Sequence, residues 1–401
     1  MNMTKPARNL DPALQSMMPV LYLIATASFA ANLSVRAIDP VLPHIADDLA
    51  VSIAEAAGLS AALAFTFAIV QPIVGAVADL IGKARVMITC LGLLGIGSIL
   101  GAFADSFPLL LATRVLCGIG AGGVFPVTLS LTSDLVPIAA RQIAISRVLA
   151  GAMIGNILGS TLGGVVGDLL GWRGVLMLLG VLTTAASIAV GIGLRGGPAT
   201  ASAVGGDFAT LKHGYRILFA NPRTKICFSV VFVEGCCVFG VFPFVASFLF
   251  ELGETRLSIA GIVIAGFALG GLLYTASVTR LLPAIGVRGL MIGGGALLGI
   301  QLVVLGLGLP WQAQMASFVV MGLGFYMLHG CMQVFASELS VEARATSLAL
   351  HSCFFFLGQT AGPILYGLGI SHLGKMPTLA LAAIAVTLVG IIGATLLVKR
   401  D

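Results

Sequence analysis

The sequence predicts an all-α membrane protein with twelve transmembrane helices in two pseudo-symmetric six-helix bundles. Of its 401 residues, 58% are hydrophobic and only 9% are charged, whereas soluble domains carry about 25% charged residues. Apolar runs of about 18 residues or more, long enough to cross a bilayer, recur along the whole chain. A repeat of sequence features near 204 residues indicates two related halves.

Twelve apolar runs account for nearly the whole chain. Glycines and prolines inside them are compatible with membrane helices, because neighbouring helices satisfy the freed backbone groups. We expect the spans at Met17–Leu42, Ile53–Leu80, Arg85–Phe103, Pro108–Val136, Ile143–Leu170, Trp172–Leu194, Lys225–Phe250, Ser258–Leu282, Gly289–Leu309, Trp311–Phe335, Ala345–Ile370 and Pro377–Val398.

The basic residues predict the orientation. With both termini in the cytoplasm, sixteen of the 21 Lys and Arg residues fall in inner segments and only Arg173, Arg256 and Lys375 in outer ones. Arg36 and Arg114 lie within helices. This distribution satisfies the positive-inside rule, so we expect a multi-pass protein of the cell membrane, in bacteria the inner membrane. The net charge of +5 marks this orientation and does not indicate a nucleic-acid partner.

One long hydrophilic interruption divides the chain. Residues 195–224 begin rich in Gly, Ala and Ser and become basic. We therefore predict an N-terminal six-helix bundle over residues 1–194, a cytoplasmic linker over 195–224 and a C-terminal six-helix bundle over 225–401. Residues 207–219 allow two interpretations, a short helix at the inner surface or a flexible linker.

The two halves repeat the same short patterns. The matching features are Ser133-Asp134-Leu135 before Arg141 with Ser337-Glu338-Leu339 before Arg344, Gly155 and Gly159 with Gly358 and Gly362, Gly164 with Gly367, and Gly118 and Gly120 with Gly322 and Gly324. Such a long period fits two parallel bundles related by an axis along the membrane normal, which can rock about a site at the bilayer midplane.

A charged turn lies between the second and third apolar runs. Its pattern is Gly75-x-x-x-Asp79-x-x-Gly82-Lys83-x-Arg85. It resembles the loop signature of the major facilitator superfamily, although Leu80 stands where that family often has a base. The resemblance implies that Gly75, Asp79, Gly82, Lys83 and Arg85 form a conformational latch at the inner ends of the helices.

Three further segments resemble the twelve-span drug:proton antiporter group of that superfamily. They are Asp39–Leu49, which resembles D-x-x-x-P-x-I-x-x-D-L; Arg114–Ala121, which resembles R-x-x-x-G-x-G; and Gly155–Gly164, which resembles G-x-x-x-G-P-x-x-G-G with Ser160 in the proline position. Glycine rows allow close helix approach. We expect a helix-interface motif formed by Gly155, Gly159, Ser160, Gly163, Gly164, Gly358, Gly362 and Pro363; packing alone is the alternative role.

Four ionisable residues lie inside the predicted spans: Arg36, Asp39, Arg114 and Glu234. A charge at the bilayer centre costs about 2.5–3.5 kcal/mol on insertion scales, so such residues line cavities or form pairs. Arg36 and Asp39 stand three residues apart and could neutralise each other, or Asp39 could pair with Arg114. The antiporter resemblance gives Arg114 a role in proton or substrate coupling.

Glu234 has no acid or base one turn away on its own helix. Because desolvation favours the protonated form of such a carboxyl, we expect it to be the titrating group or to bind a cationic or hydrogen-bonding substrate. A structural carboxyl bonded to a neighbouring carbonyl is the alternative. Possible cavity-lining residues are Asn156, Gln301, His329, His351 and Gln359, for which structurally satisfied polar groups are the alternative.

The sequence has no Walker-type nucleotide loop, no metal-ligand spacing and no nucleophile elbow, and its seven cysteines all lie in apolar runs. We therefore expect no cofactor and no enzymatic activity. The expected function is a monomeric secondary transporter that exports a small amphipathic organic compound by proton-coupled alternating access across the lipid bilayer. Import or facilitated exchange of a small metabolite is the alternative, and a non-transporting membrane receptor is a further one.

Overall fold

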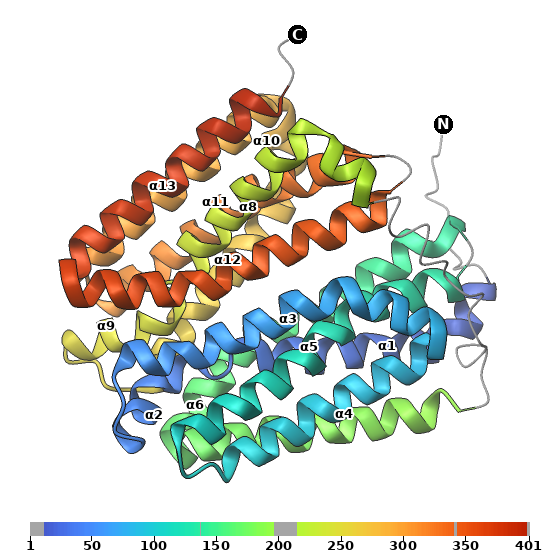
Figure 1. Ribbon diagram of the computed structural model, residues 1–401, viewed down its shortest axis with the longest axis horizontal. Helices are drawn as coiled ribbons and strands as arrows, with labels where there is room; N and C mark the ends of the chain where they lie inside the picture. Colours follow the sequence, from blue (N-terminus) through green and yellow to red (C-terminus); the bar gives the residue numbers. More distant parts are fainter. Residues whose placement is uncertain (1–11, 137, 196–214, 341–342, 399–401) are drawn as a thin grey trace, which may run out of the picture.

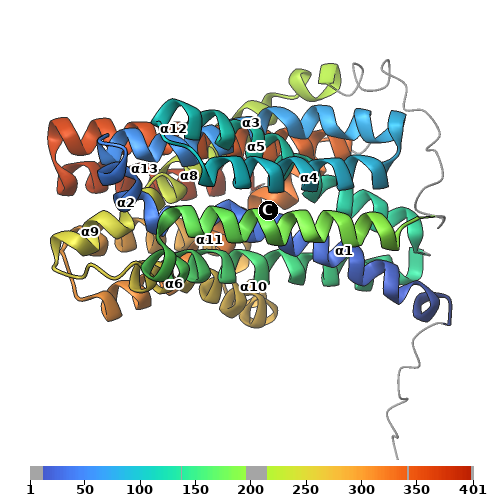
Figure 2. The ribbon, with the colours of Figure 1, turned by 90° about the horizontal axis from the view of Figure 1, so that it is seen from below.

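The computed structural model describes residues 12–136, 138–195, 215–340 and 343–398 (Figure 1). This part of the chain contains helices and no strand. Ten of its helices are long and apolar enough to cross a membrane. The all-α membrane fold expected from the sequence is confirmed in that respect. Figures 1 and 2 show the long helices running roughly side by side.

The helices form two groups that pack mainly within themselves. The first group contains α1 (Pro12–Arg36), η1 (Asp39–Val41), α2 (Leu42–Asp48), α3 (Ile53–Ile81), α4 (Lys83–Ala102), α5 (Phe107–Leu135) and α6 (Ile138–Gly193). The second contains α8 (Pro222–Phe239), η3 (Phe242–Phe244), α9 (Val245–Glu251), α10 (Leu257–Gly306), α11 (Trp311–Glu338), α12 (Arg344–Leu373) and α13 (Lys375–Leu396). Residues 215–220 are also helical, whereas the rest of the 207–219 segment lies outside the described residues.

The first span differs from the expected Met17–Leu42. Helix α1 ends at Arg36, and the chain continues through the 3₁₀ turn η1 into α2. Pro40 and Pro43 stand in the first turns of these two short helices. A proline has no N–H to donate and restricts the residue before it, so two prolines this close together favour a break in the helix here. The break places Asp39 in a buried turn.

Helices α6 and α10 are longer than one bilayer crossing requires, and each turns at a glycine with positive φ. Gly171 has φ 68° and Gly286 has φ 66°. Two other connections between helices also contain a glycine with positive φ, namely Gly82 with φ 98° and Gly374 with φ 90°. Gly286 follows Gly82 by 204 residues and Gly374 follows Gly171 by 203, so the backbone repeats the period found in the sequence. Only glycine adopts these angles without steric cost.

The two groups meet along α3 with α12 and along α6 with α10. Both contacts are close. The Phe67 and Phe356 rings lie 4.0 Å apart between α3 and α12, and a Cβ on Gly261 of α10 would meet the Ser160 carbonyl at 2.4 Å. Contacts between α2 and α9 and between η1 and η3 join the groups at one end of the molecule. The structure is therefore closed at this α2–α9 end.

Candidate functional site

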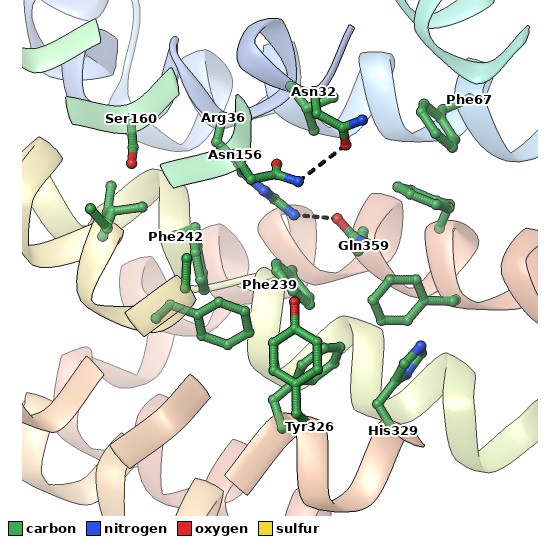
Figure 3. A pocket seen from close by; sticks show the side chains of 18 of the residues that line it. Asn32, Arg36, Phe67, Asn156, Ser160, Phe239, Phe242, Tyr326, His329 and Gln359 are labelled. Carbon is green, nitrogen blue, oxygen red and sulfur yellow. Dashed lines mark hydrogen bonds between the residues drawn. The ribbon is translucent and has the colours of Figure 1, made fainter. Parts of the chain in front are cut away.

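A cavity of about 260 Å³ lies between the two groups of helices (Figure 3). Helices of both groups contribute its walls, which include eight Phe and Tyr residues among nineteen, four amides, one arginine and one histidine. The lining residues are Asn32, Val35, Arg36, Phe67, Asn156, Ser160, Phe239, Phe242, Ile264, Ala265, Phe267, Ala268, Phe325, Tyr326, His329, Gln333, Phe355, Phe356 and Gln359.

Arg36 links the two groups at this cavity. Its guanidinium donates to the Gln359 side-chain oxygen on α12 and lies 3.4 Å from Asp39 Oδ2. The guanidinium carbon is 4.5 Å from the Phe239 ring centre and 5.1 Å from that of Phe242. Cation–π attraction of this kind is strongest where water is excluded. Arg36 is thus held by one carboxylate, one amide and two rings.

Asp39 interacts with more than one polar side chain. The Ser60 hydroxyl of α3 donates to Asp39 Oδ1 at 2.6 Å, while Arg36 contacts the other oxygen. Arg114 of α5 is 1% exposed and close enough to act electrostatically on this carboxylate. Its Nε and Nη2 have no hydrogen-bond partner within the described part of the chain. The structure therefore pairs Asp39 with Arg36, and no carboxylate of the described residues bonds directly to the nearby Arg114.

Glu234 is not the unpaired carboxylate that its own helix suggested. His329 Nδ1, on α11, lies 2.8 Å from Glu234 Oε2. Glu234 is 0% exposed, and its Oε1 has no partner among the described residues. Helical spacing on α8 could not indicate this partner, because it comes from another helix. His329 lines the cavity and Glu234 lies directly behind it.

The expected cavity-lining residues divide into two sets. Asn156, His329 and Gln359 do line the cavity, and Asn156 Nδ2 donates to Asn32 Oδ1 at 3.1 Å. His351 and Gln301 are each 1% exposed but are not part of the lining. The His351 ring lies 5.1 Å from that of His329. His351 thus belongs to the layer behind the wall.

The expected latch lies away from this cavity, at the turn between α3 and α4. Gly82 forms the turn, and Lys83 Nζ lies 2.5 Å from Asp134 Oδ2 on α5. Arg85 is exposed. The surroundings of Gly75 and the side chain of Asp79 lie outside what the structure describes. The latch role stays a prediction.

The glycine motifs lie at three different helix contacts. A Cβ on Gly155 or Gly159 would meet a carbonyl of α1 at 2.5 and 2.3 Å respectively, and a Cβ on Gly163 would meet the Ala37 carbonyl just after α1 at 2.1 Å. In the second group, a Cβ on Gly358 or Gly362 would meet the Phe232 or Cys236 carbonyl of α8 at 2.1 and 2.6 Å. Pro363 follows within α12.

Gly164 and Ser160 instead lie where the two groups meet. A Cβ on Gly164 would come within 2.3 Å of the Leu257 carbonyl of α10, and the Ser160 backbone lies against Gly261. These two motif positions therefore allow contact between the groups, whereas the other glycines allow contact within one group.

Two polar residues of the interface were missed from the sequence. Asn32 lies four residues before Arg36, and this helical spacing could have placed it at the same cavity. Asp168 accepts hydrogen bonds from the backbone N–H groups of Leu257 at 2.8 Å and Ser258 at 2.9 Å. It is an acid of α6 that caps α10 of the other group. The sequence feature that could have indicated Asp168 was its position as an isolated acid just before Gly171.

Comparison with known proteins agrees with this architecture. The chain is 25% identical over 272 residues to a chloramphenicol resistance protein of Streptomyces lividans, covering 66% of this chain and 67% of that protein. It is 28% identical over 330 residues to the 3-(3-hydroxy-phenyl)propionate transporter of Escherichia coli K12, covering 78% and 79%. The crystal structure of the nucleoside transporter NupG superposes with a TM-score of 0.76 at 13% identity, covering 92% and 97%, which shows a shared fold. Residues 24–363 match the Major Facilitator Superfamily, and the chain belongs to this family of membrane transporters.

Proposed function

We propose that the protein exports a small amphipathic organic compound by proton-coupled alternating access, with the interface cavity as its substrate site. One observation carries the proposal. The Glu234–His329 pair is buried behind the cavity wall, and His329 also forms part of that wall. A titratable pair that touches the substrate space can couple proton binding to the occupancy of that space.

The two groups of helices are proposed to be the two six-helix bundles, at 1–194 and 225–401, that tilt against each other. In this proposal α6 and α10 each cross the membrane twice, with their turns at Gly171 and Gly286, which gives twelve crossings. Both termini lie in the cytoplasm, the protein resides as a monomer in the bacterial inner membrane, and the latch and glycine motifs support the tilt. The 204-residue backbone repeat supports this arrangement.

Charge balance explains how the pair would work. With one proton between them, Glu234 and His329 are neutral as a unit, whichever residue holds it. Removing that proton leaves a carboxylate with 0% exposure and only a neutral imidazole beside it, which is costly away from water. Proton release therefore requires water at the cavity wall. Alternating access supplies water from one side at a time.

Export is the leading direction because the resemblance to antiporter motifs supports it and one relative is named as a chloramphenicol resistance protein. Uptake is the second candidate. The relative named for an aromatic acid is matched over a larger share of this chain, 78% against 66%.

The test is flux in proteoliposomes under an imposed pH gradient, with a panel of dyes, drugs and organic metabolites. We expect pH-driven movement of at least one compound, and its loss in Glu234→Gln while binding of that compound persists. Glu338→Gln, an exposed glutamate at the far end of α11, is the matched control. Unchanged pH-driven flux in Glu234→Gln would refute the coupling role.

A further inference from the structure

The charges around the cavity do not cancel. Arg36 is the only Arg, Lys, Asp or Glu among the described lining residues. Its neighbour Asp39 is 0% exposed and lies behind the wall, where Arg114 also acts on it. Two guanidinium groups thus lie near one carboxylate, which is bonded to Arg36 alone among the described arginines. This cluster carries a net charge of +1, because arginine stays protonated in proteins.

The Arg36 guanidinium has donors to spare. One terminal nitrogen lies near Asp39 Oδ2 at 3.4 Å, and the other donates to Gln359. A guanidinium has five N–H groups in a planar fork that suits a carboxylate. Its side chain is 13% exposed, on the cavity side. A carboxylate in the cavity can therefore reach it.

The rest of the cavity suits an aromatic body. Phe239 lies 5.0–5.5 Å from the rings of Phe242, Phe267, Phe325 and Phe355, three of them in T-shaped contacts. Figure 3 shows Tyr326 directing its hydroxyl towards the centre of the cavity. Rings arranged in this way present both faces and edges to a further ring, which is the geometry aromatic pairs prefer.

The dimensions limit the ligand. The volume of about 260 Å³ lies below the range of roughly 300–1,000 Å³ typical of sites for drug-sized ligands. A compound of one or two rings is the size that fits. No described lining residue offers a carboxylate to a cation, so a permanently cationic aromatic compound would meet a net positive wall without a counter-charge.

We propose that the cavity selects small monoanionic aromatic compounds, with the anionic group bound by Arg36 and the ring held among Phe239, Phe242 and Phe325. This rests on the proposed transport function, since it takes the cavity as the substrate site. It narrows the amphipathic substrate to one charge class.

Equilibrium binding to the purified full-length protein in lipid nanodiscs tests this charge preference. Three probes share one carbon skeleton and differ in charge: 4-phenylbutyrate, its neutral amide 4-phenylbutyramide, and the cationic 4-phenylbutylamine. We expect the carboxylate to bind at least about tenfold more tightly than the amide, the difference of roughly one hydrogen bond to a charged group. The amine should bind more weakly than the amide.

Two variants assign the preference to the cluster. Arg36→Gln removes the charge, and Gln359→Glu adds a carboxylate beside the guanidinium while leaving Arg36 in place. Both should bring the carboxylate to the affinity of the amide, and retained amide binding shows that the site is still folded. Arg173→Gln, at the surface beside Asp48, should keep the preference.

Equal binding of the three probes, tighter binding of the amine, or binding of none overturns the charge proposal. Failure of the transport proposal looks different. Carboxylate binding without pH-driven flux would leave the anion site standing and remove proton-coupled export. Flux of cations under a pH gradient, without anion preference, would leave proton-coupled transport standing and remove the anion site.

Discussion

Removing the Asp168 carboxylate should open the α2–α9 end of the protein. Asp168 accepts hydrogen bonds from two backbone N–H groups at the start of α10, those of Leu257 at 2.8 Å and Ser258 at 2.9 Å. The α10 N-cap residue, Arg256, provides no side-chain cap of its own. Because Asp168 belongs to α6, in the other group, these bonds exist only while the two groups are together at this end.

The expected magnitude follows from capping energetics. Loss of a helix N-cap costs about 0.5–2 kcal/mol, and loss of a negative charge at a helix N-terminus costs a further 0.3–1 kcal/mol or so. Asp168→Ala should therefore disfavour the closed arrangement by about 2 kcal/mol, a factor of about 30 in the equilibrium. Asp168→Asn keeps one acceptor oxygen, so we expect roughly half of this free energy, about a fivefold change.

Double electron–electron resonance between spin labels at Asp47→Cys and Leu252→Cys measures the distance between the two groups at this end. Asp47 lies on α2 and Leu252 follows α9, and both are exposed. The seven native cysteines are buried. We expect one short distance in the otherwise unmodified chain and a growing longer one in Asp168→Ala.

Asp105→Ala is the matched control, since Asp105 is an exposed aspartate that caps no helix of the other group within the described residues. It should leave the distance distribution unchanged. If Asp168→Ala also leaves it unchanged, the cap does not hold the two groups together and the reasoning fails.

Three further predictions concern packing, the latch and coupling. Gly358→Ala should lower thermal stability by more than about 1 kcal/mol, a typical cost of overpacking, because its Cβ would meet the Phe232 carbonyl at 2.1 Å; a melting temperature unchanged from wild type would contradict the close contact. Asp79→Asn should impair flux while the expression level stays unchanged, and unimpaired flux would contradict the latch role of this turn. His329→Gln should flatten the pH dependence of flux because it removes the bonding partner of Glu234, and a pH profile like that of wild type would contradict the coupling role of the Glu234–His329 pair.

The sequence predicted those features that depend on local spacing. The apolar runs predicted the helices. The three-residue separation of Arg36 and Asp39 predicted their ion pair, with an Asp39–Arg114 pair as the alternative, and the structure has the first. The described part of the chain has ten long helices where the sequence has twelve apolar runs, because α6 and α10 continue through Gly171 and Gly286 with no intervening loop. Glycine allows a reversal of direction within one residue, which leaves no polar stretch to separate the runs.

Contacts between helices could not be predicted in the same way. The Glu234–His329 pair joins α8 to α11 across 95 residues, and the Asn32–Asn156 bond joins α1 to α6 across 124. Periodicity within one helix shows which residues share a face, but not which helix that face meets. In the second case the glycines bring α6 so close to α1 that two short amide side chains can reach each other.

The aromatic cluster around Phe239 connects Arg36 with the Glu234–His329 pair. Arg36 lies on the Phe239 ring, Phe239 contacts Phe325, and Phe325 stacks on His329 at 4.7 Å. A cargo molecule among these rings therefore occupies the space through which a water chain would reach the imidazole. Under the proposed mechanism, a loaded carrier would be sealed against futile proton leak by the cargo itself, and the empty carrier would be the form that exchanges protons with the solution.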